Sequence, residues 1–185
     1  MTLLSVFPLV SGLLLALALT INGAAFQDRD HLTPQEVDLV KEAQELDKRI
    51  EIFIKAADRR LLALNGVDQA NAKQLKKDAE KWGELPSGSR TELVADIARI
   101  LDEAITNIDD VSAHDERNPL IARALRNLAA EATRLVNQLK PLSGQAKSDA
   151  EVASFEQLME NAQSILEAAN KLPPPADKKK DKSKN

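Results

Sequence analysis

Residues 89–111 carry the clearest helical pattern of the chain and read SRTELVADIARILDEAITNIDDV. Ser89 and Glu92 have the spacing of a capping box, in which each side chain accepts a hydrogen bond from the backbone N–H of the other residue. The apolar residues that follow recur at helical spacing on one broad stripe: Leu93, Val94, Ile97, Ile100, Leu101, Ala104, Ile105, Ile108 and Val111. The sequence therefore predicts a helix that starts after Ser89, frays near His114 and buries one face.

A second helix is predicted nearer the start of the chain, from Pro34 to Leu64. Thr33 and Glu36 have the spacing of another capping box, Pro34 occupies the first helical position, and Asn65-Gly66 can adopt the positive φ that ends a helix. Its apolar residues also share one face: Leu39, Ala43, Leu46, Ile50, Phe53, Ile54, Ala57, Leu61 and Leu64. This face must be buried against another element.

Two further helices are predicted in the second half of the chain. The first begins with the capping pair Asn118-Pro119 and ends at Lys140, directly before a proline. The second is capped by Ser148 and Glu151 and ends before the three prolines that start at Pro173. We expect the inward residues of this last helix to be Val152, Phe155, Leu158, Met159, Ala162, Ile165, Leu166 and Ala169.

These four stripes predict an all-α fold, because the alternation of apolar and polar residues typical of strands is missing from the sequence. We expect a four-helix bundle over residues 34–172, with antiparallel neighbours. The connection from Val67 to Gly88 is too long for a turn and also allows a parallel course for the helix after it. Four residues at helical spacing predict a short extra helix there, on the bundle surface: Ala72, Leu75, Ala79 and Trp82.

The two ends of the chain predict a targeting segment at the N-terminus and a tail at the C-terminus. Residues 1–27 carry no charged side chain, and Gly23 and Ala25 supply the small residues of a signal-peptide cleavage site after Ala25. We expect residues 1–25 to be a signal peptide that directs export, or else a retained N-terminal membrane anchor. Residues 26–33 are a polar lead, and residues 173–185 are a Pro-rich and then Lys-rich segment that we expect to be disordered.

The composition excludes several classes of chemistry. The chain has 185 residues, a formal net charge of −4, 43% apolar and 29% charged residues. Because it contains no Cys, it has no disulfides, Cys-ligated zinc or iron–sulfur clusters. The acidic excess argues against binding to nucleic acid, which requires a basic face.

One polar cluster is a candidate metal site. Asp110 and His114 are four residues apart, so they share a helix face, and Asp115 follows directly. One imidazole and two carboxylates can contribute to a divalent-metal site. The same residues also suit a solvated helix end, and this second interpretation is favoured. We therefore expect no metal and no cofactor. Catalysis is not expected either, because the chain lacks the Gly-x-Ser-x-Gly turn of a Ser nucleophile.

A small apolar line lies on the predicted first helix, opposite its main stripe: Ile52, Ala56, Arg59 and Ala63. The simpler explanation, which involves no function, is a single exposed Ile among alanines. The alternative is a docking face, either for a partner protein or a second copy, or for the segment from Val67 to Gly88. Lysines in that segment and in the C-terminal tail are either solvated or attach the chain weakly to an anionic surface.

Two stretches resemble known proteins. Leu32-Thr33-Pro34-Gln35-Glu36 resembles the Leu-Thr-x-x-Gln signature of periplasmic helical chaperones of the Spy and CpxP type, with Gln one place earlier. Residues 46–60 resemble exported bacterial helical proteins of unknown function. These resemblances imply a bacterial source and an export route to the periplasm or the exterior.

The sequence thus favours an exported helical protein that acts by binding a protein partner in the cell envelope. The alternatives are a carrier of a small ligand or metal ion between the helices, and a periplasmic chaperone-like protein.

Overall fold

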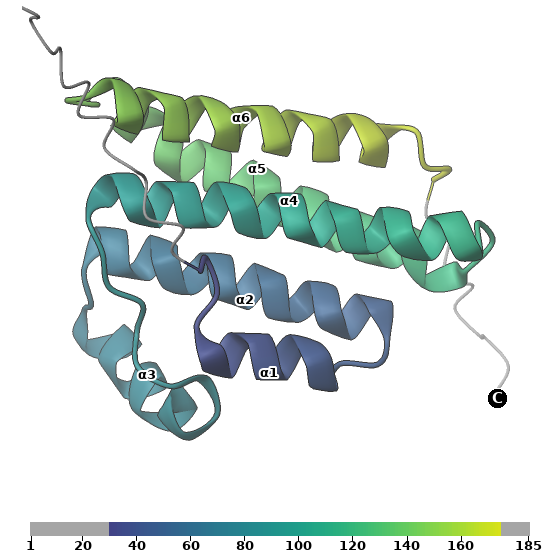
Figure 1. The fold of residues 1–185 in the computed structure, drawn as a ribbon, viewed down its shortest axis with the longest axis horizontal. Helices are drawn as coiled ribbons and strands as arrows, with labels where there is room; N and C mark the ends of the chain where they lie inside the picture. The colour runs from purple at the N-terminus through teal and green to yellow at the C-terminus, as the bar shows by residue number, and fades with distance from the viewer. Residues whose placement is uncertain (1–29, 175–185) are drawn as a thin grey trace, which may run out of the picture.

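The computed structural model describes residues 30–174, and this part of the chain is entirely helical and without strands. It contains six helices (Figure 1): α1 (Pro34–Glu42), α2 (Leu46–Asn65), α3 (Gln69–Trp82), α4 (Arg90–His114), α5 (Pro119–Ser143) and α6 (Asp149–Asn170). The all-α class is confirmed, whereas the expected count of four helices and one extra is wrong. The predicted signal peptide or anchor and the Lys-rich part of the tail lie outside the described residues.

The predicted helix from Pro34 to Leu64 is in fact two helices. The chain leaves the helical conformation at Ala43, where ψ is 100°, and α1 lies back along α2 (Figure 1). Arg49 stabilises the end of α1, because its Nε and Nη2 donate hydrogen bonds of 3.2 and 3.1 Å to the Ala43 carbonyl oxygen. The apolar spacing continues across the break, and no Gly or Pro marks it, so periodicity alone could not reveal the reversal.

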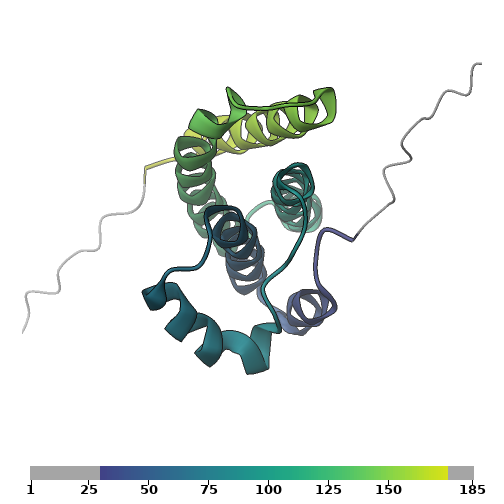
Figure 2. The same cartoon turned by 90° about the vertical axis from the view of Figure 1, so that its left-hand side faces the viewer.

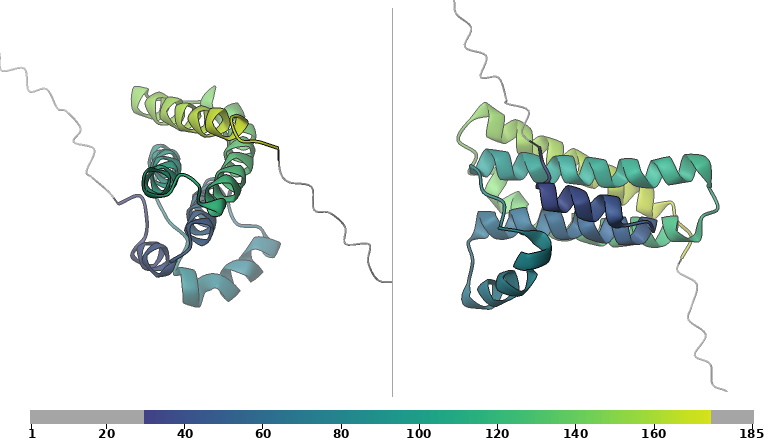
Figure 3. Two further views of the ribbon diagram at one scale, coloured as in Figure 1. Left: turned by 90° about the vertical axis from the view of Figure 1, so that its right-hand side faces the viewer. Right: turned by 60° about the horizontal axis from the view of Figure 1, so that its bottom comes forward.

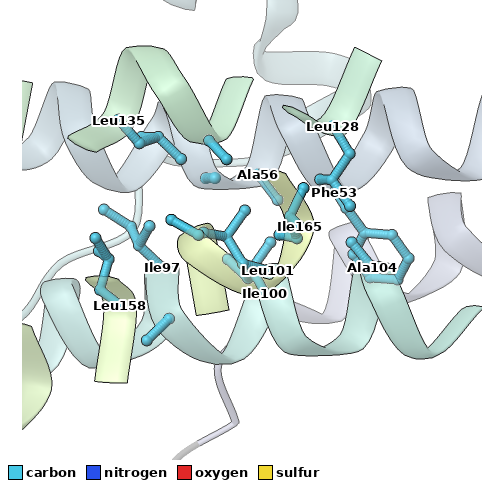
Figure 4. Close-up of a cluster of buried hydrophobic side chains, with 14 of the residues drawn as sticks. Phe53, Ala56, Ile97, Ile100, Leu101, Ala104, Leu128, Leu135, Leu158 and Ile165 are labelled. Carbon is cyan, nitrogen blue, oxygen red and sulfur yellow. The ribbon is translucent and has the colours of Figure 1, made fainter. Parts of the chain in front are cut away.

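Four helices enclose one hydrophobic core, and consecutive members of the series α2, α4, α5 and α6 run in opposite directions (Figure 1). Seen end on, α4 and α5 each lie beside both α2 and α6, while α1 and α3 lie outside this group (Figures 2 and 3). In the core, one fully buried side chain from each helix points into the space between the helices (Figure 4): Phe53 of α2, Leu101 of α4, Leu128 of α5 and Leu158 of α6. Burial of such side chains stabilises the fold by about 1.5–3 kcal/mol each.

The predicted helix in the long connection is confirmed as α3. The Asp68 side chain accepts a hydrogen bond of 2.7 Å from the Asn71 N–H at its start, and Gly83 ends it at a φ of +67°. Trp82 is buried, as expected for an anchor, and the rest of α3 is half-buried or exposed.

Both capping boxes at Thr33 and Ser89 are confirmed, but two predicted details in the second half are wrong. The helix expected to stop at Lys140 continues through Pro141 to Ser143. A proline this close to a helix end costs only one hydrogen bond, and the Leu142 carbonyl oxygen beyond it accepts a hydrogen bond from Arg90.

Val152, expected in the core, is instead 41% exposed. The neighbouring Glu151 takes the buried position, because its carboxylate lies 2.7 Å from the Nε of Arg90.

Candidate functional site

A buried ion cluster joins α1 to α2. Glu36, Arg59 and Arg60 are exposed by only 0%, 2% and 1%. One carboxylate oxygen of Glu36 accepts hydrogen bonds from the Nε of Arg59 at 3.2 Å and from the Nη1 of Arg60 at 2.6 Å. Burial lowers the pKa of the Arg59 guanidinium, with Glu36 acting in the opposite direction. Since a buried charge without its partner is strongly unfavourable, the cluster forces α1 and α2 to stay together.

Arg59 extends this cluster to the end of α3. Its Nη2 donates hydrogen bonds to the carbonyl oxygens of Trp82, Gly83 and Glu84, at 3.1, 3.3 and 2.5 Å. Its guanidinium also lies over the Trp82 ring, 5.8 Å from the ring centre, a geometry that permits a cation–π interaction. Arg59 therefore fixes the C-terminal end of α3 against the α1–α2 pair.

The rest of α3 stands away from the other helices. Its main chain comes close to that of α1 and of no other helix in residues 30–174. Figures 2 and 3 show α3 crossing beneath the packed helices. This arrangement leaves an open groove of about 670 Å³ between α2, α3 and α5, which we call the α3 groove. Its apolar lining includes Leu62 of α2, Leu75 of α3 and Val67, which is 46% exposed.

Charged side chains along the α3 groove are paired within the chain. Lys55 of α2 lies 3.2 Å from the carboxylate of Asp78 on α3, which also accepts a 2.7 Å hydrogen bond from Gln74. Arg134 of α5 pairs with Asp58 of α2. These pairs link α2 to both neighbours, and the apolar Leu62, Val67 and Leu75 belong to the same lining. Such a lining suits a polypeptide segment, which buries apolar side chains and meets polar groups at the edge.

Arg134 also connects the groove to a buried carboxylate. Its Nε and Nη2 donate hydrogen bonds of 3.0 and 2.5 Å to Glu131 on the same helix. Burial raises the pKa of Glu131 to about 7 and lowers that of Arg134. The charge state of this wall of the groove is therefore sensitive to pH near neutrality.

The structure separates the four residues of the predicted docking line. Ala56 is fully buried in the hydrophobic core, and Arg59 is buried against the segment that follows α3. Ile52 and Ala63 are half-buried on α2. Of the occupants considered for this line, the connecting segment is the one that Arg59 contacts. The α3 groove includes Arg59 in its lining but none of the other three residues.

The residues considered for a metal site lie at the exposed end of α4. The Nδ1 of His114 is 2.6 Å from the backbone oxygen of Asp110, and Asp115 forms the helix cap. Within residues 30–174, no three side chains of His, Asp or Glu are grouped so that they could hold a metal ion. In the same range, no helix combines the length and apolar character that crossing a membrane requires.

Sequence reasoning missed the ion cluster. Glu36 was interpreted only as a capping residue, and its Oε2 does accept a 2.9 Å hydrogen bond from the Thr33 N–H. Arg60 offered a signal, because it follows Phe53 by seven residues and therefore shares a helix face with that core residue. A charged residue on a buried face requires a partner, and Glu36 is that partner.

Comparisons of the chain with protein-family models, with curated proteins and with solved structures find no match.

Proposed function

We propose that this protein acts by binding, without catalysis, and that it holds a segment of a partner protein in the α3 groove. The observation that carries the proposal is the open groove of about 670 Å³ beneath a helix that is fixed chiefly at one end. Leu62, Val67 and Leu75 offer apolar contacts, and Lys55 and Arg134 offer polar contacts at its edges.

The scaffold in this proposal is a four-helix bundle made of α2, α4, α5 and α6, with α1 and α3 as additions. The well-packed core of these four helices would hold the α2 and α5 walls of the groove in a constant position. The third wall, α3, could adjust to its occupant, since few buried contacts restrain it along its length.

We place this binding in the cell envelope. Support comes from the uncharged stretch of residues 1–27 and from Gly23 and Ala25, which fit a cleavage site after Ala25. The partner would then be an exported or membrane-bound protein.

Photo-crosslinking in the native host tests the proposal. A photoreactive amino acid replaces Leu75 in the groove or, as a control, the exposed Val152 on α6. We expect Leu75 to yield one distinct adduct with another protein and Val152 to yield none. Adding Val67→Glu should weaken the Leu75 adduct. Identical adducts from both positions, or a Leu75 adduct unaffected by Val67→Glu, would contradict the proposal.

A further inference from the structure

The outer face of α3 carries four exposed lysines: Lys73, Lys76, Lys77 and Lys81. Three of them are four residues apart and so form a row along the helix, with Lys76 beside it. The row spans about 12 Å, since each helical residue advances about 1.5 Å. Glu80 is the one carboxylate within this face, which leaves an excess of three positive charges on a chain whose net charge is −4.

Most of this basic face points away from the α3 groove, although Lys81 lies at its edge, within about 20° of the groove residue Gln74 around the helix axis. The residues of α3 that line the groove are Asn71, Gln74, Leu75 and Asp78, and none of the four lysines is among them. The buried Trp82 lies on the groove side, within about 20° of Leu75 around the helix axis. The lysines are therefore exposed residues outside the groove lining. They belong to a helix that stands apart from the others (Figures 1 and 2).

The chemistry of this face suits an extended anionic surface. All its cations are lysines, which act as hydrated point charges and do not provide the paired hydrogen bonds by which Arg recognises one carboxylate or phosphate. A single protruding helix is convex and offers no pocket of the kind that encloses a small anionic ligand. A flat layer of negative charge can meet all four lysines at once.

We propose that the outer face of α3 docks on a membrane surface that contains anionic phospholipid. Each lysine close to such a surface increases the partition coefficient by about fivefold, and the effect falls off within a Debye length of about 8 Å. The docking is electrostatic and reversible. It is independent of the proposed partner binding, because a membrane on this face would leave the α3 groove open on the other.

Vesicle cosedimentation of the full chain tests this inference. The vesicles contain phosphatidylcholine alone or mixed with phosphatidylglycerol. We expect binding to the mixed vesicles only, and weaker binding as the salt concentration rises. Replacing Lys73, Lys76, Lys77 and Lys81 by Gln should lower the partition coefficient by about tenfold or more.

A matched control removes the same number of charges elsewhere. Lys41, Lys48, Lys140 and Lys147 are also exposed, and they belong to α1, α2, α5 and the segment before α6. Their replacement by Gln should change the partition coefficient by less than about twofold, since they are not gathered on one face. Circular dichroism should show both variants to be folded.

Three results would overturn the inference. An equal decrease of the partition coefficient in the two variants would indicate that net charge or another part of the chain drives binding. No binding of the unaltered chain to the mixed vesicles would exclude the membrane as the target. If the unaltered chain does not bind the vesicles but captures an envelope protein that the α3 variant alone fails to capture, the lysines would be assigned to an acidic protein instead.

Discussion

The carboxylate of Glu36 on α1 lies 2.6 Å from Nη1 of Arg60 on α2, although 24 residues separate them in the chain. The same carboxylate accepts a hydrogen bond from Arg59, which in turn binds three carbonyl oxygens at the end of α3. One buried anion therefore connects the first three helices. The position of α3, and with it the shape of the groove, depends on this contact.

Loss of the Glu36 carboxylate should destabilise the whole domain. In the variant Glu36→Gln, two buried guanidinium groups would lose their anion, and breaking a buried ion pair typically costs about 3–5 kcal/mol. Glu42→Gln on the exposed side of the same helix is the control and should change the free energy of unfolding by less than about 0.5 kcal/mol. Urea denaturation measures both. A cost for Glu36→Gln no larger than that of the control would refute this role of the cluster.

Arg59→Lys should release the end of α3 and leave the core intact. A Lys keeps the charge but cannot bind Glu36 and the carbonyl oxygens after α3 together, because it lacks the planar guanidinium fork. Trp82 is the one Trp of the chain, so its fluorescence reports on this contact directly. We expect a shift of its emission to longer wavelength and faster amide exchange in α3. Arg126→Lys on α5, which alters a hydrogen bond from Arg126 to the carbonyl oxygen of Pro173 after α6, should change neither signal.

The two glycines that flank α3 should differ in their tolerance of a side chain. Gly66 and Gly83 have φ of +83° and +67° with ψ of 162° and −166°, a region that essentially only Gly adopts, so Ala should cost about 1–3 kcal/mol at each. A Cβ at Gly66 meets no atom within 4 Å, whereas one at Gly83 would lie 3.1 Å from the Cδ of Gln35. Thermal melts should therefore show the larger loss for Gly83→Ala, and Gln35→Ala should remove the difference. Equal losses at both glycines would mean that Gln35 moves away freely.

The stability of the protein should fall as the pH rises from about 4.5 to about 7, because of Glu131. Burial raises the pKa of this carboxyl from 4.5 to about 7, so the folded state favours its protonated form. The loss of stability that comes from ionising the buried Glu131 is absent well below pH 4.5. It grows between pH 4.5 and pH 7 and reaches about 3 kcal/mol above pH 7. Glu131→Gln should thus be more stable than the unaltered chain at about pH 8, by up to about 3 kcal/mol, and by less than about 1 kcal/mol at about pH 5.

Urea denaturation of both proteins across this pH range measures the difference. A difference that does not vary with pH would show that the hydrogen bonds from Arg134 keep Glu131 ionised throughout.

Local signals in the sequence were sufficient to predict most helix starts. Ser89 and Glu92, or Thr33 and Glu36, lie within one turn of each other, so their pairing requires no knowledge of the rest of the fold. Trp82 could likewise be predicted as an anchor, because it is a large apolar residue on an otherwise polar helix.

The reversal after α1 depends on contacts that are distant in sequence. Nothing near Ala43 distinguishes a bend from a continuing helix, and the bend is compensated by the ion cluster of Glu36, Arg59 and Arg60. The α3 groove could not be predicted for the same reason. Its existence depends on where Arg59 holds the end of α3, which the spacing of Leu75 and Trp82 does not specify.

Affinity capture from the native envelope with three versions of the full chain tests the binding role most directly. The versions are the unaltered chain, Val67→Glu in the α3 groove and Val152→Glu on α6, and the two valines are similarly exposed at 46% and 41%. Quantitative mass spectrometry compares the captured proteins. We predict at least one protein that is retained by the unaltered chain and by Val152→Glu and is depleted at least about tenfold by Val67→Glu, a loss of about 1.4 kcal/mol in binding. Capture that is equal for all three versions would contradict a partner site in the α3 groove.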